Sequence, residues 1–139
     1  MKKIYPKIEP KFLLMYGPQI FDKRFGAIKP EGSLGLIYLA SSLRNKDFEV
    51  SVLDASVGND SYTLEETFFN EKIQPNGLVR IGMNIKDILG EVVDYDVIGI
   101  SSIFTAQTRM AEEVVAEIRR EYPDKIIILG GVNAKSQMP

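Results

Sequence analysis

Four short hydrophobic runs are spaced along the chain, and each is bounded by glycine, proline or acidic residues. They cover residues 11–16, 49–54, 96–101 and 125–130. Three of them are almost continuously apolar, which is typical of strands buried on both faces of a parallel sheet. The run at 49–54 alternates apolar and polar residues, as a strand at the edge of a sheet can. The pattern therefore predicts four strands.

Helical periodicity fills most of the sequence between these runs. Apolar residues that repeat at helical spacing predict one helix over residues 32–46 and a second around residues 85–92. Asn84 is the expected N-cap of the second helix. The clearest apolar stripe, at residues 111–122, lies opposite charged residues and ends at Pro123, which cannot continue a helix. Strands and helices thus alternate along the chain.

This alternation predicts right-handed parallel crossovers, and hence an α/β, doubly wound, flavodoxin-like (Rossmann-like) parallel sheet. We expect the strand order 2-1-3-4, which puts the run at 125–130 at an edge. Only nine residues follow Gly130, although this fold normally continues with another helix and strand. We therefore expect residues 1–139 to be a single, C-terminally truncated domain from a longer protein. The segment 56–82 is irregular apart from a short helix expected at 63–72, and the sequence does not indicate its role.

Composition removes several classes of chemistry. The chain has no Cys and no His, so disulfides, thiolate nucleophiles, Cys-held clusters and histidine ligands are excluded within it. Lys and Arg number 17 against 19 Asp and Glu, and the basic residues are scattered, so we expect no nucleic-acid surface. No run approaches the roughly 18 apolar residues of a membrane span, and the charged start lacks the apolar core of a signal peptide. We therefore expect a cytoplasmic protein.

The candidate chemistry lies at the carboxyl ends of the predicted strands, where open parallel sheets bind ligands. Small and hydroxylic residues gather there, and they let a ligand approach the backbone and form hydrogen bonds. Each could simply form a turn, but three such strand ends together favour a ligand. No dinucleotide, Walker A or nucleophile-elbow motif occurs and the carboxylates form no convincing pair, so we expect no catalytic residue. With Cys and His absent as well, we expect no metal ligand. The residues expected to line one groove are Gly17, Ser101, Thr105, Gly130 and Asn133.

Several blocks of the sequence resemble, in order and spacing, the N-terminal cobalamin (vitamin B12)-binding domain of the cobalamin-dependent radical S-adenosylmethionine (SAM) enzymes. They are residues 30–44, 49–55, 96–105 and 126–134. The last block often reads Gly-Gly-x-His-Ala in that family, whereas Asn133 takes the place of the His here.

The resemblance implies that the chain binds cobalamin and presents the corrin to a downstream radical SAM domain. The segments Ser101-x-Ile103 and Gly130-Gly131 stand where cobalamin-binding folds receive the nucleotide tail of the cofactor. Together with Gly17, Pro18, Thr105 and Asn133 they form the candidate cofactor-binding set. We also expect that a bulky residue in place of Gly131 weakens binding while the fold stays nearly intact.

The same resemblance places the rest of the chemistry outside this chain. An iron–sulfur cluster and S-adenosylmethionine would belong to the downstream domain, because its Cys-x-x-x-Cys-x-x-Cys motif is absent here. The parent protein would be an enzyme, such as a methyltransferase or a magnesium-protoporphyrin monomethyl ester cyclase. The fragment alone would not be catalytic.

One departure concerns the cobalt ligand. Cobalamin proteins that ligate the metal carry Asp-x-His-x-x-Gly after the first strand, but residues 17–32 contain no His, so the corrin would be held without one. Two alternatives of the flavodoxin-like class stay open. A receiver-like regulatory domain would need an acidic residue where Ser101 stands, and a flavin- or nucleotide-binding domain is disfavoured by the missing phosphate loop.

Overall fold

The computed structural model describes residues 9–26 and 34–132. A four-stranded parallel sheet in the order β3-β1-β6-β7 forms its centre. The strands are β1 (Phe12–Tyr16), β3 (Val50–Asp54), β6 (Val97–Ser101) and β7 (Ile126–Gly130). In terms of the four predicted strands this is the order 2-1-3-4, with β7 at an edge, so the predicted topology is confirmed. The strand numbers differ because three further short strands intervene along the chain.

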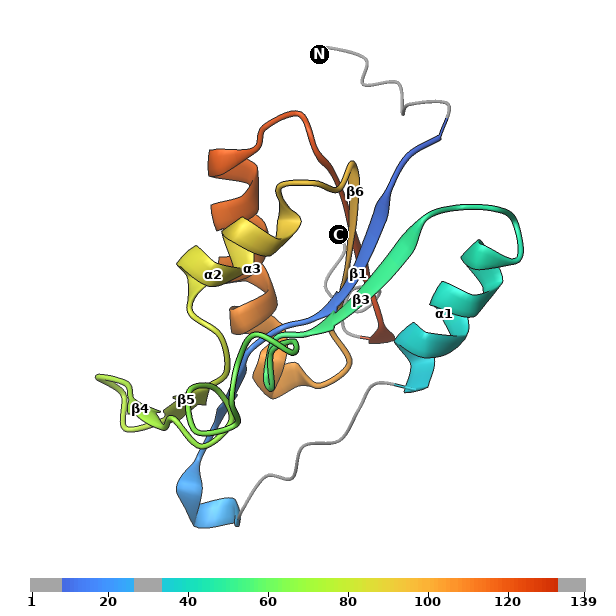
Figure 1. Ribbon diagram of the computed structural model, residues 1–139. Helices are drawn as coiled ribbons and strands as arrows, with labels where there is room; N and C mark the ends of the chain where they lie inside the picture. Colours follow the sequence, from blue (N-terminus) through green and yellow to red (C-terminus); the bar gives the residue numbers. More distant parts are fainter. Residues whose placement is uncertain (1–8, 27–33, 133–139) are drawn as a thin grey trace.

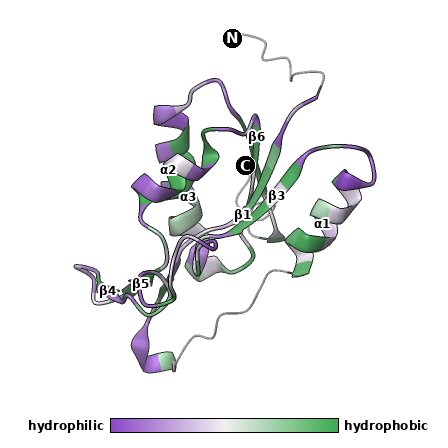
Figure 2. Cartoon of the chain, viewed as in Figure 1, coloured by the Kyte–Doolittle hydropathy of each residue, from purple (hydrophilic) through white to green (hydrophobic). Residues whose placement is uncertain are grey.

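Both faces of the sheet carry helices, as the alternating pattern predicts. Figure 1 shows α1 (Leu34–Arg44) on one face, with α2 (Ile85–Val92) and α3 (Thr108–Glu121) on the other. Successive side chains of β1 point to opposite faces of the sheet, so β1 contacts the helices on both faces. Leu13 and Met15 pack in the core under α2 and α3, whereas Leu14 belongs to a separate cluster with α1. Figure 2 shows the resulting band of hydrophobic residues through the central strands.

The predicted helices are confirmed with small changes of their ends. α2 has Asn84 as its N-cap, but that side chain makes no capping bond and is a partner of Lys72 instead. α3 begins at Thr108, directly after the 3-10 turn η2 (Thr105–Gln107). In the described part of the chain, no helix is long and apolar enough to cross a membrane.

A second sheet, antiparallel and in the order β2-β5-β4, is absent from the sequence predictions. It consists of β2 (Gln19–Phe21), β5 (Val79–Ile81) and β4 (Lys72–Ile73). The side chain of Gln107 fixes β2 to the start of α3, because its amide accepts a bond from Ile20 N and donates one to Ile20 O, both of 3.0 Å. This clamp holds the chain after β1 away from the α1 face of the main sheet.

The prediction of a short helix at residues 63–72 is wrong. A Thr63–Glu66 capping box does form, with Thr63 N donating to Glu66 Oε2 at 2.8 Å. The next turns do not continue as a helix, because Phe69 N donates to Leu64 O at 2.8 Å, across five residues. The segment therefore closes as a series of turns over a small core of Phe68 and the β5 residues.

Candidate functional site

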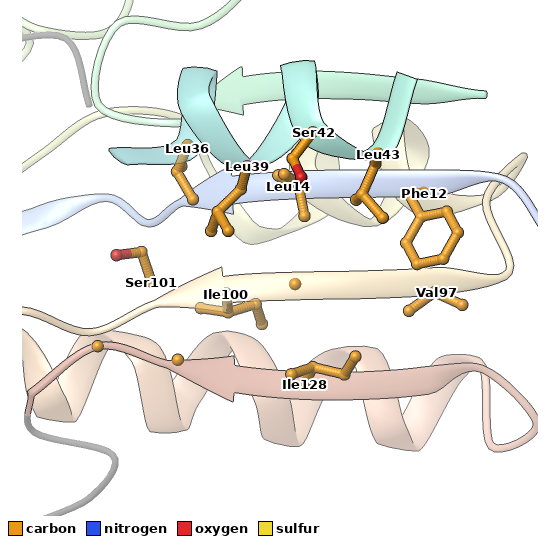
Figure 3. Close-up of a pocket in the computed structure, with 13 residues that line it drawn as sticks. Phe12, Leu14, Leu36, Leu39, Ser42, Leu43, Val97, Ile100, Ser101 and Ile128 are labelled. Carbon is orange, nitrogen blue, oxygen red and sulfur yellow. The ribbon is translucent and has the colours of Figure 1, made fainter. Parts of the chain in front are cut away.

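A groove of about 330 Å³ lies on the α1 face of the main sheet. α1 packs over β3 and β1, so in the described part of the chain no helix covers β6 and the edge strand β7 on this face. Residues of β6 and β7 form the floor of the groove, and α1 forms one wall (Figure 3). The lining residues are Phe12, Leu14, Leu36, Leu39, Ser42, Leu43, Val97, Gly99, Ile100, Ser101, Ile128, Gly130 and Gly131.

The lining is almost entirely apolar. Among the described residues, its polar side chains are the hydroxyls of Ser42, on α1, and Ser101, the last residue of β6, and no charged side chain of these residues takes part. Neither hydroxyl makes a hydrogen bond to the described part of the chain. Figure 3 places Ser101 at the carboxyl end of the groove and Ser42 near its middle. An apolar cleft with a few free polar groups suits a flat, largely apolar ligand and disfavours an anion.

Two glycines keep the floor of the groove open. A Cβ at Gly99 would lie 2.8 Å from Leu14 Cδ2, so a side chain there would displace Leu14 and raise the floor. Gly130 pairs with Ser101 across the two strands, and a Cβ at that position would meet nothing closer than Ile100 O at 4.0 Å. A side chain at Gly130 would therefore stand in the groove without disturbing the sheet.

Gly131 is required by the local backbone conformation. The prediction that a bulky residue in its place leaves the fold nearly intact is therefore wrong. Its φ of +100° favours glycine, and a Cβ would lie 2.3 Å from Ser102 O. A bulky residue would force the two strand ends apart, so it would damage the fold as well as any ligand site. Gly130 is the position at which the two effects separate.

The structure brings together part of the predicted set. Ser101, Gly130 and Gly131 line the groove, and these three lie at neighbouring strand ends. Four others are not among its lining residues, although they follow the carboxyl ends of β1 and β6: Gly17, Pro18, Ile103 and Thr105. Asn133 lies outside the described residues. The clamp on Ile20 explains the position of Gly17 and Pro18, since it draws the chain after β1 toward the α3 face.

The α1 wall is the part of the site that sequence reasoning missed. The helical spacing of Leu36, Leu39, Ala40 and Leu43 predicts a buried helix face and no ligand contact, and the sequence predicts no role for Ser42. One signal was available: α1 is apolar on more than one side, because Leu34 and Ile37, at 70% and 52% exposure, lie outside the stripe of Leu36 and Leu43. Such a helix indicates a further contact, but the sequence alone does not say which side makes it.

Titratable groups with shifted pKa values lie away from the groove. Burial lowers the pKa of Arg80, whose guanidinium donates to Met83 O at 2.8 Å. Hydrogen bonds from Arg24 lower the pKa of Asp22 to about 2. Among the described residues, no cluster of three or more Asp, Glu, His or Cys could hold a metal ion. What the described residues offer in the groove is therefore an apolar surface and two hydroxyl groups.

Comparison with known proteins gives one positive result. The family described as "B12 binding domain" matches residues 30–138. The matched segment contains α1, β6 and β7, which supply most of the groove. No curated protein and no solved structure matches the chain.

Proposed function

The chain belongs to the B12-binding domain family, and on this premise we propose that it is a cobalamin-binding module whose groove receives the base that ends the nucleotide tail of the cofactor, while the phosphate of the tail stays outside the groove. The observation that carries the proposal is the apolar groove bordered by Ser101, Gly130 and Gly131. The tail of cobalamin ends in 5,6-dimethylbenzimidazole, a flat ring system with two methyl groups and one free nitrogen when it is not bound to cobalt. A mostly apolar cleft with unpartnered hydroxyls suits such a ring.

The residues present fit this group. The Ser101 hydroxyl is half-buried and makes no hydrogen bond to the residues that the structure describes, so it can donate one to a ring nitrogen. Gly99 and Gly130 leave space that a Cβ would fill, and Gly131 allows close approach of the two strand ends. Bound cobalamin would supply methyl-transfer or one-electron chemistry at cobalt. The part of this chain is to bury the tail and hold the corrin.

The proposal includes a cobalt without a protein imidazole, because the chain contains no His. Any group of this chain that binds the cobalt would be one other than imidazole, and residues 17–32, which follow the first strand, would be the candidates to supply it. Gly17, Pro18, Ile103 and Thr105 lie at the carboxyl ends of the strands, so they remain our candidates for contacts with the corrin. Asn133 remains a candidate on sequence grounds.

We further propose that the parent protein is a cobalamin-dependent radical SAM enzyme of the methyltransferase or magnesium-protoporphyrin monomethyl ester cyclase type. The support is the resemblance of the four sequence blocks and the lack of His in residues 17–32. The iron–sulfur cluster and S-adenosylmethionine would be bound by the downstream radical SAM domain. The residues encoded after Pro139 test this step: a Cys-x-x-x-Cys-x-x-Cys motif supports it, and a different domain there contradicts it.

Equilibrium dialysis of the chain against cobalamin tests the binding function. We expect saturable binding of one cobalamin per chain. Ser101→Ala should weaken it, because the ring nitrogen would lose its hydrogen-bond donor. Ser41→Ala is the matched control, since Ser41 lies on α1 next to Ser42 but does not line the groove. Equal effects of the two substitutions would contradict the assignment of the tail to the groove.

A further inference from the structure

The polarity of the groove changes along its length. Ser101 lies at the carboxyl end, Leu36 lies toward the same end on α1, and Ser42 lies near the middle (Figure 3). Beyond Ser42 the lining consists of Phe12, Leu43 and Val97, all apolar. From Ser101 to Val97 the floor follows β6 for about 13 Å, at the usual rise per residue of a strand. A ligand group that enters from the carboxyl end therefore passes the two hydroxyls and ends against hydrocarbon.

The backbone of the groove floor offers few hydrogen-bonding groups besides the hydroxyls of Ser42 and Ser101. β6 lies between β1 and β7, and its amides and carbonyls are used in the two parallel ladders. Gly130 O accepts a bond of 2.8 Å from Ser102 N. Within the described part of the chain, a ring held over this floor can thus reach the hydroxyls of Ser42 and Ser101, and its other polar atoms would face apolar side chains.

Cobamides share the corrin and differ in the base that ends the nucleotide tail. Dimethylbenzimidazole presents one free nitrogen, which one of the two hydroxyls can satisfy, and two methyl groups, which suit the apolar end. Adenine presents an amino group and additional ring nitrogens, so at least some of these would be buried without a partner. A buried polar atom without a hydrogen bond costs free energy that exceeds the gain from an ordinary satisfied pair.

We propose that the groove selects among cobamides by the base of the nucleotide tail, accepting dimethylbenzimidazole and discriminating against adenine. This inference rests on the proposed function, since it assigns the tail to the same groove. Leu39 is the specificity-determining wall residue that can be tested most cleanly. It faces the groove between the two hydroxyls, and its 57% exposure means that a polar replacement costs little in packing.

The test measures affinities of the chain for three probes by equilibrium dialysis: cobalamin, the adenine-containing pseudocobalamin, and cobinamide, which lacks the nucleotide. We expect cobalamin to bind about tenfold more tightly than pseudocobalamin, or more, as one unsatisfied buried polar atom predicts. Leu39→Gln supplies an amide to the wall and should shrink this ratio. Ile37→Gln is the matched control, because Ile37 is an exposed α1 residue that does not line the groove.

The outcomes separate the two proposals. Equal binding of cobalamin and pseudocobalamin would overturn the selectivity and leave the cobalamin-binding function in place. Equal changes of the ratio in Leu39→Gln and Ile37→Gln would overturn the role of the groove wall. If cobinamide binds as tightly as cobalamin, the nucleotide tail does not contribute to binding, and its assignment to the groove is overturned. If none of the three probes binds, the proposed function itself is overturned.

Discussion

Gly130→Val is the perturbation that most cleanly separates ligand binding from folding. Gly130 is the last residue of β7 and pairs with Ser101, and a Cβ at this position would have no neighbour closer than 4.0 Å. Valine favours strands, so the free energy of unfolding should rise by about 0.5–1 kcal/mol relative to glycine. Its three side-chain carbons would stand at the carboxyl end of the groove, where the tail is proposed to enter.

The expected loss of cobalamin affinity follows from overpacking. Extra carbon atoms in a filled site cost about 1–3 kcal/mol, which corresponds to roughly 5-fold to 150-fold weaker binding. Titration calorimetry gives the affinity, and urea unfolding followed by circular dichroism gives the stability. The control is Gly90→Ala on α2, which also has open space around its Cβ. It should raise stability by about 1 kcal/mol and leave the affinity unchanged. A folded Gly130→Val variant that binds cobalamin as tightly as the native chain would refute the reasoning.

Three further substitutions test other parts of the structure. Ser102→Ala removes a buried hydroxyl without a partner, so the unfolding free energy should rise by about 1 kcal/mol in urea; a fall would mean that the hydroxyl is satisfied. Gly131→Ala should lower it by about 2 kcal/mol or more, since its Cβ meets Ser102 O at 2.3 Å, and an unchanged urea midpoint would contradict the clash. Bonds from Arg24 depress the pKa of Asp22 from 3.8 to about 2, so the stability from this pair is present above pH 4 and disappears between about pH 4 and 2. Asp22→Asn should remove that acid-dependent part, and a pH profile of unfolding identical to that of the native chain would contradict it.

The four main strands and three helices could be predicted because each has a strong hydrophobic period. The runs at 96–101 and 125–130 became β6 and β7 with their starts moved by one residue. The second sheet could not be predicted in this way. β2, β5 and β4 have two or three residues each, too few for a period, and tertiary contacts such as the Gln107–Ile20 bonds hold them in place.

The groove was predictable at its carboxyl end and not along its wall. Ser101, Gly130 and Gly131 could be named because carboxyl ends of parallel strands meet at one edge of a sheet. The role of Ser42 depends on where α1 lies across the sheet, over β3 and β1 with β6 and β7 left open. Periodicity identifies which residues share a helix face, but it does not give that lateral position.

The absorption spectrum of cobalamin bound to the chain tests the central claim most directly. Free hydroxocobalamin at neutral pH has its own dimethylbenzimidazole on cobalt, so withdrawal of the tail into the groove must change the spectrum to the base-off form. The chain contains no His that could replace the base. After removal of free ligand, we expect retained cobalamin with a base-off spectrum. Bound cobalamin with an unchanged base-on spectrum, or a chain that retains none, would contradict the account.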